Sequence, residues 1–214
     1  MMKADLLLFD IDGTLVDSRQ DITTSVNLML KDLGLEELGF DEVVSFIGSG
    51  LGSLITRSMG PGNEPFFEKA VERFEYHYSR HITDTSTLYP GTKSVLEHFK
   101  DRKMYVITNR NKDLADMSLK HLKIRDYFLD VFGGDEKEQI KPSPYSINRV
   151  LDLTGLDKNK SIIIGDMDVD ILAGKNAGIK TCAVTYGLGT REDLSKANPD
   201  YMIDSLLELE NIIS

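Results

Sequence analysis

Two aspartates stand two positions apart directly after a short apolar run, in the segment Asp10-x-Asp12-Gly13-Thr14. In an extended backbone, side chains two positions apart point the same way, so the Asp10 and Asp12 carboxylates can face one pocket. Gly13 then permits a sharp turn that few other residues tolerate. The same residues could instead form a capped turn with solvated acids, but their place at the end of an apolar run favours a pocket.

A second acidic segment begins with Asp166 and continues through Asp168 and Asp170. Aspartate is common at the N-terminal cap of a helix, and that interpretation stays open for Asp168 and Asp170. Asp166 is harder to explain as a cap, because it follows the end of another apolar run. Together with Asp10 and Asp12 it would make an all-oxygen cluster, which suits a hard cation such as Mg²⁺.

Three short apolar runs must position these residues, and each run ends abruptly in polar side chains. Continuous apolar runs of this length, followed by helical patterns, predict buried parallel strands of an α/β sheet. Ligands bind at the edge where the carboxyl ends of such strands meet. The sequence therefore predicts that Asp10, Thr108-Asn109 and Asp166 come together at that edge. The runs are Leu6–Phe9, Met104–Ile107 and Ile162–Ile164, and further strands are expected at Thr181–Thr185 and Tyr201–Ile203.

Helical patterns separate these strands, and one long block of them interrupts the alternation. After the first strand, roughly 65 residues contain only helical patterns broken by glycines, at 22–33, 41–46, 51–58 and 66–78. We therefore predict an α/β fold, with a Rossmann-like parallel sheet core flanked by helices and an inserted α-helical cap subdomain. Residues 1–16 and 83–214 would form the discontinuous catalytic core, and residues 17–82 the cap. The core helices are expected at 92–100, 113–122, 145–153 and 171–177.

The composition limits the classes of partner. The chain has 214 residues, and its 25 Lys and Arg against 35 Asp and Glu give a net charge of −10. Such a surface repels nucleic acid and anionic lipid, so we expect neither as a partner.

No apolar run approaches the ~20 residues of a membrane span, and the short run before Asp10 does not suit a signal peptide. With its single cysteine, Cys182, the chain fits a reducing compartment. We expect a cytoplasmic protein, and the residues favour neither a monomer nor a dimer.

The motifs, taken in order along the chain, resemble those of haloacid dehalogenase superfamily phosphatases, and in particular of the phosphoglycolate-phosphatase-like group. The resemblance covers nearly the whole length. It rests on four motifs, which correspond to Asp10–Ser18, Val106–Asn109, Lys141–Pro144, and Gly165-Asp166 with Asp170. The resemblance implies a Mg²⁺-dependent phosphatase that acts on a small phosphorylated metabolite, with phosphoglycolate as the first expectation.

The resemblance also implies a role for each motif residue. Asp10 would attack phosphorus and carry an aspartyl-phosphate intermediate, while Asp12 would protonate the leaving alkoxide and then deprotonate water. Two carboxylates this close raise the pKa of one of them, which suits a proton carrier. Asp10, Asp166 and the main-chain carbonyl of Asp12 would hold Mg²⁺, with Asp170 supporting them. The phosphoryl group would be bound by Thr108, the Asn109 amide and Lys141.

Several other functions share part of this pattern. A phosphomutase, a pyrophosphatase or a nucleotidase of the same superfamily would keep the same core and the aspartyl-phosphate. A dehalogenase is disfavoured, because its chemistry needs no acid at position 12. A non-catalytic binding protein is also disfavoured, because every motif position retains a competent side chain.

In this family a helical cap closes over the active site and selects the substrate, and Ser45–Leu51 resembles its substrate-facing loop. The glycines of that loop could bring main-chain amides close to a second anionic group. Arg57 and Arg110 are candidates to bind a substrate carboxylate, although each is expected at the surface. The aromatic side chains of the cap are expected to pack inside it, namely Phe66, Phe67, Phe74 and Tyr78.

Overall fold

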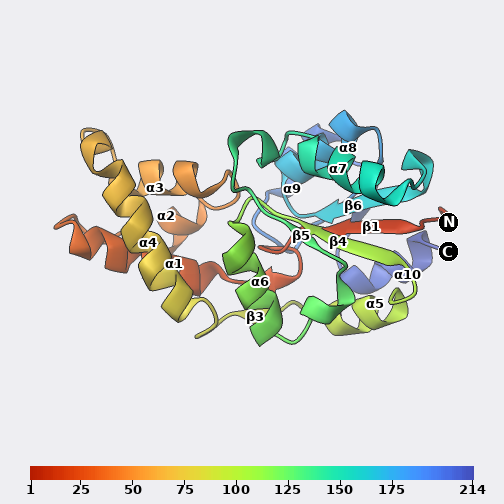
Figure 1. Ribbon diagram of the computed structural model, residues 1–214, viewed down its shortest axis with the longest axis horizontal. Helices are drawn as coiled ribbons and strands as arrows, with labels where there is room; N and C mark the ends of the chain where they lie inside the picture. The colour runs from red at the N-terminus through yellow and green to blue at the C-terminus, as the bar shows by residue number, and fades with distance from the viewer.

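A six-stranded parallel sheet lies in the larger part of the molecule in the computed structural model, which describes residues 1–214 (Figure 1). The strand order is β5-β4-β1-β6-β7-β8. The sequence missed β5 (Val131–Phe132), because two residues are too few to show a pattern. The five predicted strands are confirmed as β1 (Leu6–Phe9), β4 (Lys103–Ile107), β6 (Ser161–Gly165), β7 (Lys180–Val184) and β8 (Tyr201–Ile203).

The central strand β1 sets the position of the site. Phe9, its last residue, pairs with Val106 of β4 on one side and with Ile164 of β6 on the other. Because the three strands are parallel and in register, the polar residues that follow them emerge at the same edge of the sheet. All four residues of β1 are buried, as a continuous apolar strand covered on both faces requires.

Helices cover both faces of the sheet, and the side chains of β1 alternate between the two layers (Figure 1). Leu7 and Phe9 pack in a core with α5 (Thr92–His98), α6 (Lys112–His121) and α10 (Leu209–Ile212). Leu6 and Leu8 pack on the opposite face with α7 (Tyr145–Thr154) and α8 (Asp168–Ala177). Helix α9 (Arg191–Ala197) packs beside α8. This layered arrangement confirms the predicted α/β fold.

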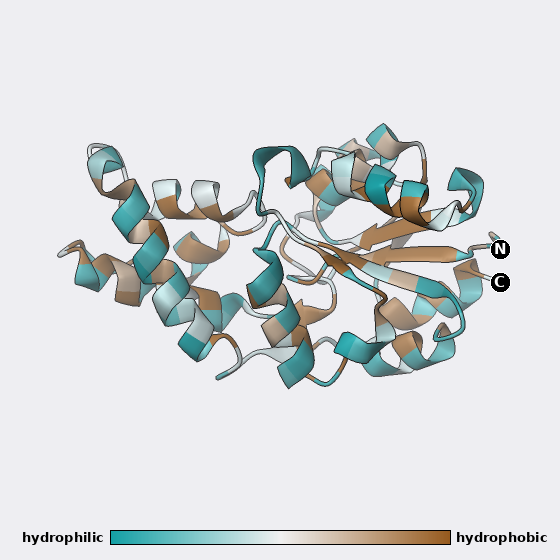
Figure 2. Ribbon diagram, viewed as in Figure 1, coloured by the Kyte–Doolittle hydropathy of each residue, from teal (hydrophilic) through white to brown (hydrophobic).

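The block of helical patterns after β1 forms four helices beyond the carboxyl edge of the sheet (Figure 1). They are α1 (Arg19–Asp32), α2 (Phe40–Val44), α3 (Leu51–Met59) and α4 (Phe67–His81). Their apolar faces turn toward one another (Figure 2) and enclose a second core that contains Val26, Met29, Ile55 and Phe74. Phe66 is an exception to the expected packing, because it precedes α4 and is half exposed.

A small antiparallel ribbon joins this helical block to the sheet. It pairs β2 (Val16–Asp17) with β3 (Thr87–Leu88), two short strands at the ends of the helical block that the sequence did not predict. Asp21, at the start of α1, ties the two connections together. Its buried carboxylate accepts hydrogen bonds from the main-chain N–H and the hydroxyl of both Thr85 and Ser86.

Short 3₁₀ helices complete the secondary structure, at Glu64–Phe66, Arg125–Tyr127, Lys137–Gln139, Lys158–Lys160 and Leu206–Glu208. None of the helices combines the length and the apolar composition that a membrane crossing needs.

Candidate active site

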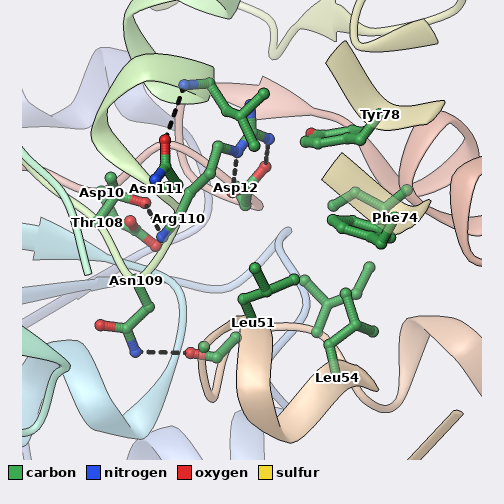
Figure 3. Close-up of a pocket in the computed structure, with 15 residues that line it drawn as sticks. Asp10, Asp12, Leu51, Leu54, Phe74, Tyr78, Thr108, Asn109, Arg110 and Asn111 are labelled. Carbon is green, nitrogen blue, oxygen red and sulfur yellow. Dashed lines mark hydrogen bonds and ion pairs between the residues drawn. The ribbon is translucent and has the colours of Figure 1, made fainter. Parts of the chain in front are cut away.

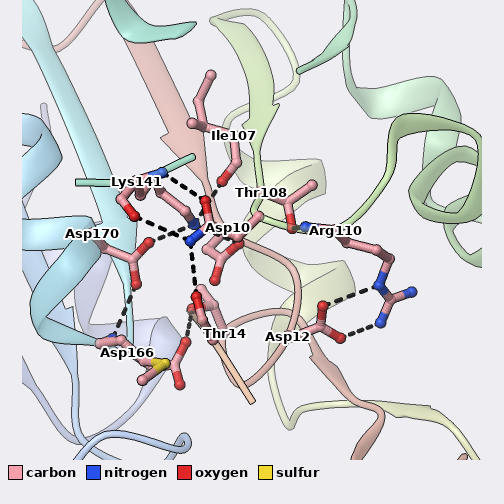
Figure 4. Close-up of polar contacts among 12 residues, drawn as sticks. Asp10, Asp12, Thr14, Ile107, Thr108, Arg110, Lys141, Asp166 and Asp170 are labelled. Carbon is pink, nitrogen blue, oxygen red and sulfur yellow. Dashed lines mark hydrogen bonds and ion pairs between the residues drawn. The ribbon is translucent and has the colours of Figure 1, made fainter. Parts of the chain in front are cut away.

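Asp10 lies at the centre of the carboxyl edge, where its main-chain N–H donates to Ile164 O at 3.0 Å. Its side chain is buried, and Oδ1 lies 2.8 Å from Nζ of Lys141 (Figure 4). Oδ1 accepts no hydrogen bond of good geometry, so its contact with the lysine is an ion pair. Burial raises the pKa of Asp10 to about 7; the Lys141 charge opposes that shift, and the charges of Asp170 and Asp12 add to it.

Lys141 is buried behind Asp10 and binds three oxygens at once. Besides Asp10, its Nζ donates to Asp170 Oδ1 at 2.6 Å and to the main-chain oxygen of Ile107 at 3.0 Å. Burial by itself lowers the pKa of Lys141, but the charges of Asp10 and Asp170 outweigh it and raise the pKa. The lysine is therefore a fixed positive charge inside the site.

Replacing Lys141 with methionine is expected to lower the free energy of unfolding of the metal-free protein by about 3–5 kcal/mol, because removing one partner of a buried ion pair leaves the other charge uncompensated. Urea unfolding measures the change. The exposed Lys137→Met provides the matched control, since Lys137 makes no ion pair, and a second change, Asp170→Asn, should recover part of the loss. A loss as small as that of the control would contradict this role for Lys141.

Three buried carboxylates meet beside this lysine. Oxygens of Asp10, Asp166 and Asp170 lie within 4.8 Å of one another. Asp166 accepts from Thr14 Oγ1 and from the main-chain N–H of Leu188, each at 2.7 Å. Burial raises the pKa of Asp166, and the charges of Asp170 and Asp10 raise it further. One lysine cannot balance three carboxylates, so the donor set fits a divalent cation that prefers oxygen ligands.

The turn after β1 brings the chain very close to this cluster. Gly13 has a φ of +84°, and a Cβ at that position would overlap Oδ2 of Asp166. Asp170 has less freedom to bind a metal, because one of its oxygens accepts from Lys141 and the other from the Met167 main-chain N–H at 3.0 Å. Both oxygens of Asp170 are therefore engaged within the protein.

Asp12 points away from the carboxylate cluster and toward Arg110 (Figure 4). Nε of Arg110 donates to Asp12 Oδ2 at 3.0 Å, Nη2 contacts the other carboxylate oxygen, and the Ser18 hydroxyl also donates to Asp12. The expectation that Arg110 is a surface residue was wrong, because only 9% of it is exposed. The sequence signal that could have placed Arg110 in the site is its position directly after the Thr108-Asn109 motif.

Thr108 and Asn109 follow β4 and face the same pocket. The Thr108 hydroxyl accepts from the Arg110 main-chain N–H at 3.2 Å. The Asn109 side chain donates to the main-chain oxygens of Gly48 and Lys141 and accepts from the Lys141 main-chain N–H. It therefore links the sheet, the loop before α3 and the Lys141 loop. The main-chain N–H of Asn109 donates to no acceptor within the protein.

A pocket of about 70 Å³ lies between the sheet edge and the helical block (Figure 3). Its polar wall comes from the sheet edge, including Asp10, Asp12, Thr108 and Arg110. Gly48, Gly50 and Leu51 line it from the helical block, so the loop expected to face the substrate does reach the site. Arg57 does not line it; its guanidinium lies over the Phe46 ring and donates to the Ser45 main-chain oxygen.

Two aromatic residues of α4 also line the pocket, in addition to packing inside the helical block as predicted. Phe74 and Tyr78 are one turn apart on the helix and stack on each other, with ring centroids 5.2 Å apart. The Arg110 guanidinium lies over the Tyr78 ring, 5.1 Å from its centroid. The i, i+4 spacing of the aromatic residues shows that they share a face, but not which surface that face meets.

Comparisons with known proteins give consistent results. The family model of haloacid dehalogenase-like hydrolases matches residues 7–184. The chain is 34% identical over 210 residues to a phosphoglycolate phosphatase of Aquifex aeolicus, an alignment that covers 97% of this chain and 96% of that protein. It is 32% identical to a phosphoglycolate phosphatase of Vibrio parahaemolyticus, with 98% and 96% covered. A crystal structure described as a predicted phosphoglycolate phosphatase from Haemophilus somnus superposes with a TM-score of 0.92 at 28% identity, covering 99% of both chains.

Proposed function

The chain belongs to the haloacid dehalogenase-like hydrolase family and is a phosphatase, and we propose that it hydrolyses phosphoglycolate or a similarly small phosphate monoester through a phosphorylated Asp10, with Mg²⁺ bound beside it. The observation that supports this proposal most directly is the position of Asp10. The carboxylate is buried at the end of the central strand, in contact with a fixed lysine and close to two further carboxylates.

In the first step, an oxygen of Asp10 attacks phosphorus while the bond from phosphorus to the leaving alcohol oxygen breaks. Asp12 lines the same pocket and, in its protonated form, donates a proton to that oxygen. In the second step, Asp12 takes a proton from water, the water oxygen bonds to phosphorus, and the bond between phosphorus and Asp10 breaks. Asp10 is thereby regenerated, and inorganic phosphate leaves.

The chain offers hydrogen-bond donors for the transferring phosphoryl group. The main-chain N–H groups of Ile11, Asp12 and Asn109 have no acceptor within the protein, and the Thr108 hydroxyl lines the pocket. Lys141 keeps its charge beside Asp10 throughout. Because these groups are held in place before the substrate arrives, they need little rearrangement in the transition state.

The metal would be held by the carboxylates of Asp10 and Asp166 and by the main-chain oxygen of Asp12, with Asp170 orienting its neighbours. When bound, Mg²⁺ supplies positive charge that offsets the repulsion between the carboxylates and the substrate phosphate. We assign residues 17–82 the role of a cap that encloses the leaving group. The pocket supports this assignment, since Gly48, Leu51 and Phe74 of the helical block form part of its wall opposite the sheet edge.

The test is an assay of purified protein with Mg²⁺ and 2-phosphoglycolate, in which we expect release of inorganic phosphate. The same assay with β-glucose 1-phosphate, pyrophosphate and a nucleoside monophosphate distinguishes the alternatives. An isomerised sugar phosphate without phosphate release would indicate a mutase. Phosphate release only from pyrophosphate would indicate a pyrophosphatase, and release only from the nucleoside monophosphate would indicate a nucleotidase. If no substrate in the panel released phosphate, the proposed function would be wrong.

A further inference from the structure

One nitrogen of the buried Arg110 has no partner. The side chain is only 6% exposed. Two of its three guanidinium nitrogens, Nε and Nη2, are bound to Asp12, but Nη1 is buried without a hydrogen bond. A buried donor left unpaired costs free energy, and this one belongs to a residue that lines the pocket. Nη1 is therefore available to donate to an acceptor inside the pocket.

The Tyr78 hydroxyl is a second buried group without a partner. It is on the same pocket wall, and its ring lies against the Arg110 guanidinium. Figure 3 shows the Tyr78 hydroxyl turned toward the Arg110–Asp12 pair. Two unpaired donors, one from α4 and one from the loop after β4, thus lie close together, although they are 32 positions apart in the sequence.

The rest of the pocket carries no second positive charge, and the main-chain amides of the loop with Gly48 and Gly50 are among its other donors to an anion. Arg110 is the only cationic residue among those that line it, and the two acidic residues, Asp10 and Asp12, would repel an anion. The wall from the helical block and α6 is mainly apolar, with Ile22, Ile47, Leu51, Leu54, Phe74 and Leu114. Arg110 is therefore the one group in the pocket that can form an ion pair with an anion on the alcohol part of the substrate.

We propose that Arg110 and Tyr78 are specificity-determining residues that bind a carboxylate on the alcohol part of the substrate. This inference rests on the proposed phosphatase function and narrows its substrate class to phosphorylated short hydroxy acids. Arg110 also holds Asp12, the residue that protonates the ester oxygen. Since one planar guanidinium contacts both groups, the carboxylate must lie within a few bonds of the ester oxygen, as it does in a 2-phospho acid.

The test compares kcat/KM for 2-phosphoglycolate with kcat/KM for 2-hydroxyethyl phosphate, which has a similar size and an uncharged hydroxyl in place of the carboxylate. We expect the protein to prefer the acid by roughly 10- to 100-fold, the range that hydrogen bonds to charged groups provide. Arg110→Gln should bring the ratio close to 1, Arg110→Lys should keep part of it, and Tyr78→Phe should reduce it several-fold. The ratio is the informative quantity, because any effect of Arg110 through Asp12 is common to both esters.

Arg57→Gln is the matched control, because Arg57 carries the same charge in the helical block but does not line the pocket. It should keep the ratio of the unchanged protein. Similar kcat/KM values for both esters in the unchanged protein, or an unaltered ratio in Arg110→Gln, would overturn the inference and leave the phosphatase function intact. Absence of phosphate release from either ester would overturn the proposed function and the inference together. If Arg110→Gln does not fold, the ratio of the two kcat/KM values is measured for Arg110→Lys and Tyr78→Phe instead, and an unaltered ratio in both variants would overturn the inference.

Discussion

Asp10→Asn is expected to abolish phosphate release, with kcat falling by about 10⁴- to 10⁶-fold, the loss typical of removing a catalytic nucleophile or its essential partner. The amide of asparagine has nearly the shape of the carboxylate but is a poor nucleophile, so the aspartyl-phosphate cannot form. Steady-state release of inorganic phosphate measures the loss. Trapping the phosphorylated protein by acid quenching should give a labelled chain for the unchanged protein and none for the variant.

The fold should survive this substitution. Burial raises the pKa of Asp10 to about 7, which means that the ionised carboxylate is held in the folded protein at a cost. Asparagine carries no charge, so the melting temperature of metal-free Asp10→Asn should not fall below that of the unchanged protein. Asp168→Asn is the matched control. Asp168 is two residues from Asp166, but its side chain accepts a hydrogen bond from the Val169 main-chain N–H. The turnover of the Asp168→Asn variant should therefore be unchanged. Normal turnover by Asp10→Asn would exclude Asp10 as the nucleophile.

Removing Mg²⁺ with excess EDTA is the second change with a large expected effect, and it should abolish turnover reversibly. Asp10, Asp166 and Asp170 are buried together with one lysine, and the substrate phosphate adds further negative charge at this place. Without a cation, this repulsion is not offset during phosphoryl transfer. Activity should return when Mg²⁺ exceeds the chelator, and full turnover in excess EDTA would contradict metal dependence.

Metal binding can also be measured without activity. A ligand that binds only the folded state stabilises it by about 2.7 kcal/mol at a concentration 100 times its Kd, so Mg²⁺ should raise the melting temperature. Asp166→Asn should remove most of that increase, because the substitution takes away a carboxylate of the cluster. Asp168→Asn should keep it. An equal increase in both variants would place the metal elsewhere.

The sequence determined the fold and most of the polar residues of the site. Leu6–Phe9 and Ile162–Ile164 are continuous apolar runs, and a strand buried on both faces needs such a run. The carboxyl ends of parallel strands share one edge, so the positions of Asp10 and Asp166 at the ends of those runs were enough to predict that they meet. Strand β5 escaped prediction, because pairing with β4 and not a local pattern defines it.

Only the tertiary structure decided the surroundings of Arg110. An arginine in a polar segment is normally exposed, and its burial here depends on Asp12, 98 positions earlier, and on Tyr78 of α4. The same holds for Tyr78, whose spacing from Phe74 shows a shared helix face without showing that the face meets the pocket. Local sequence patterns report which side of an element is apolar. How the segments pack decides which charged group from a distant segment approaches that side, and this packing sets the composition of the pocket wall.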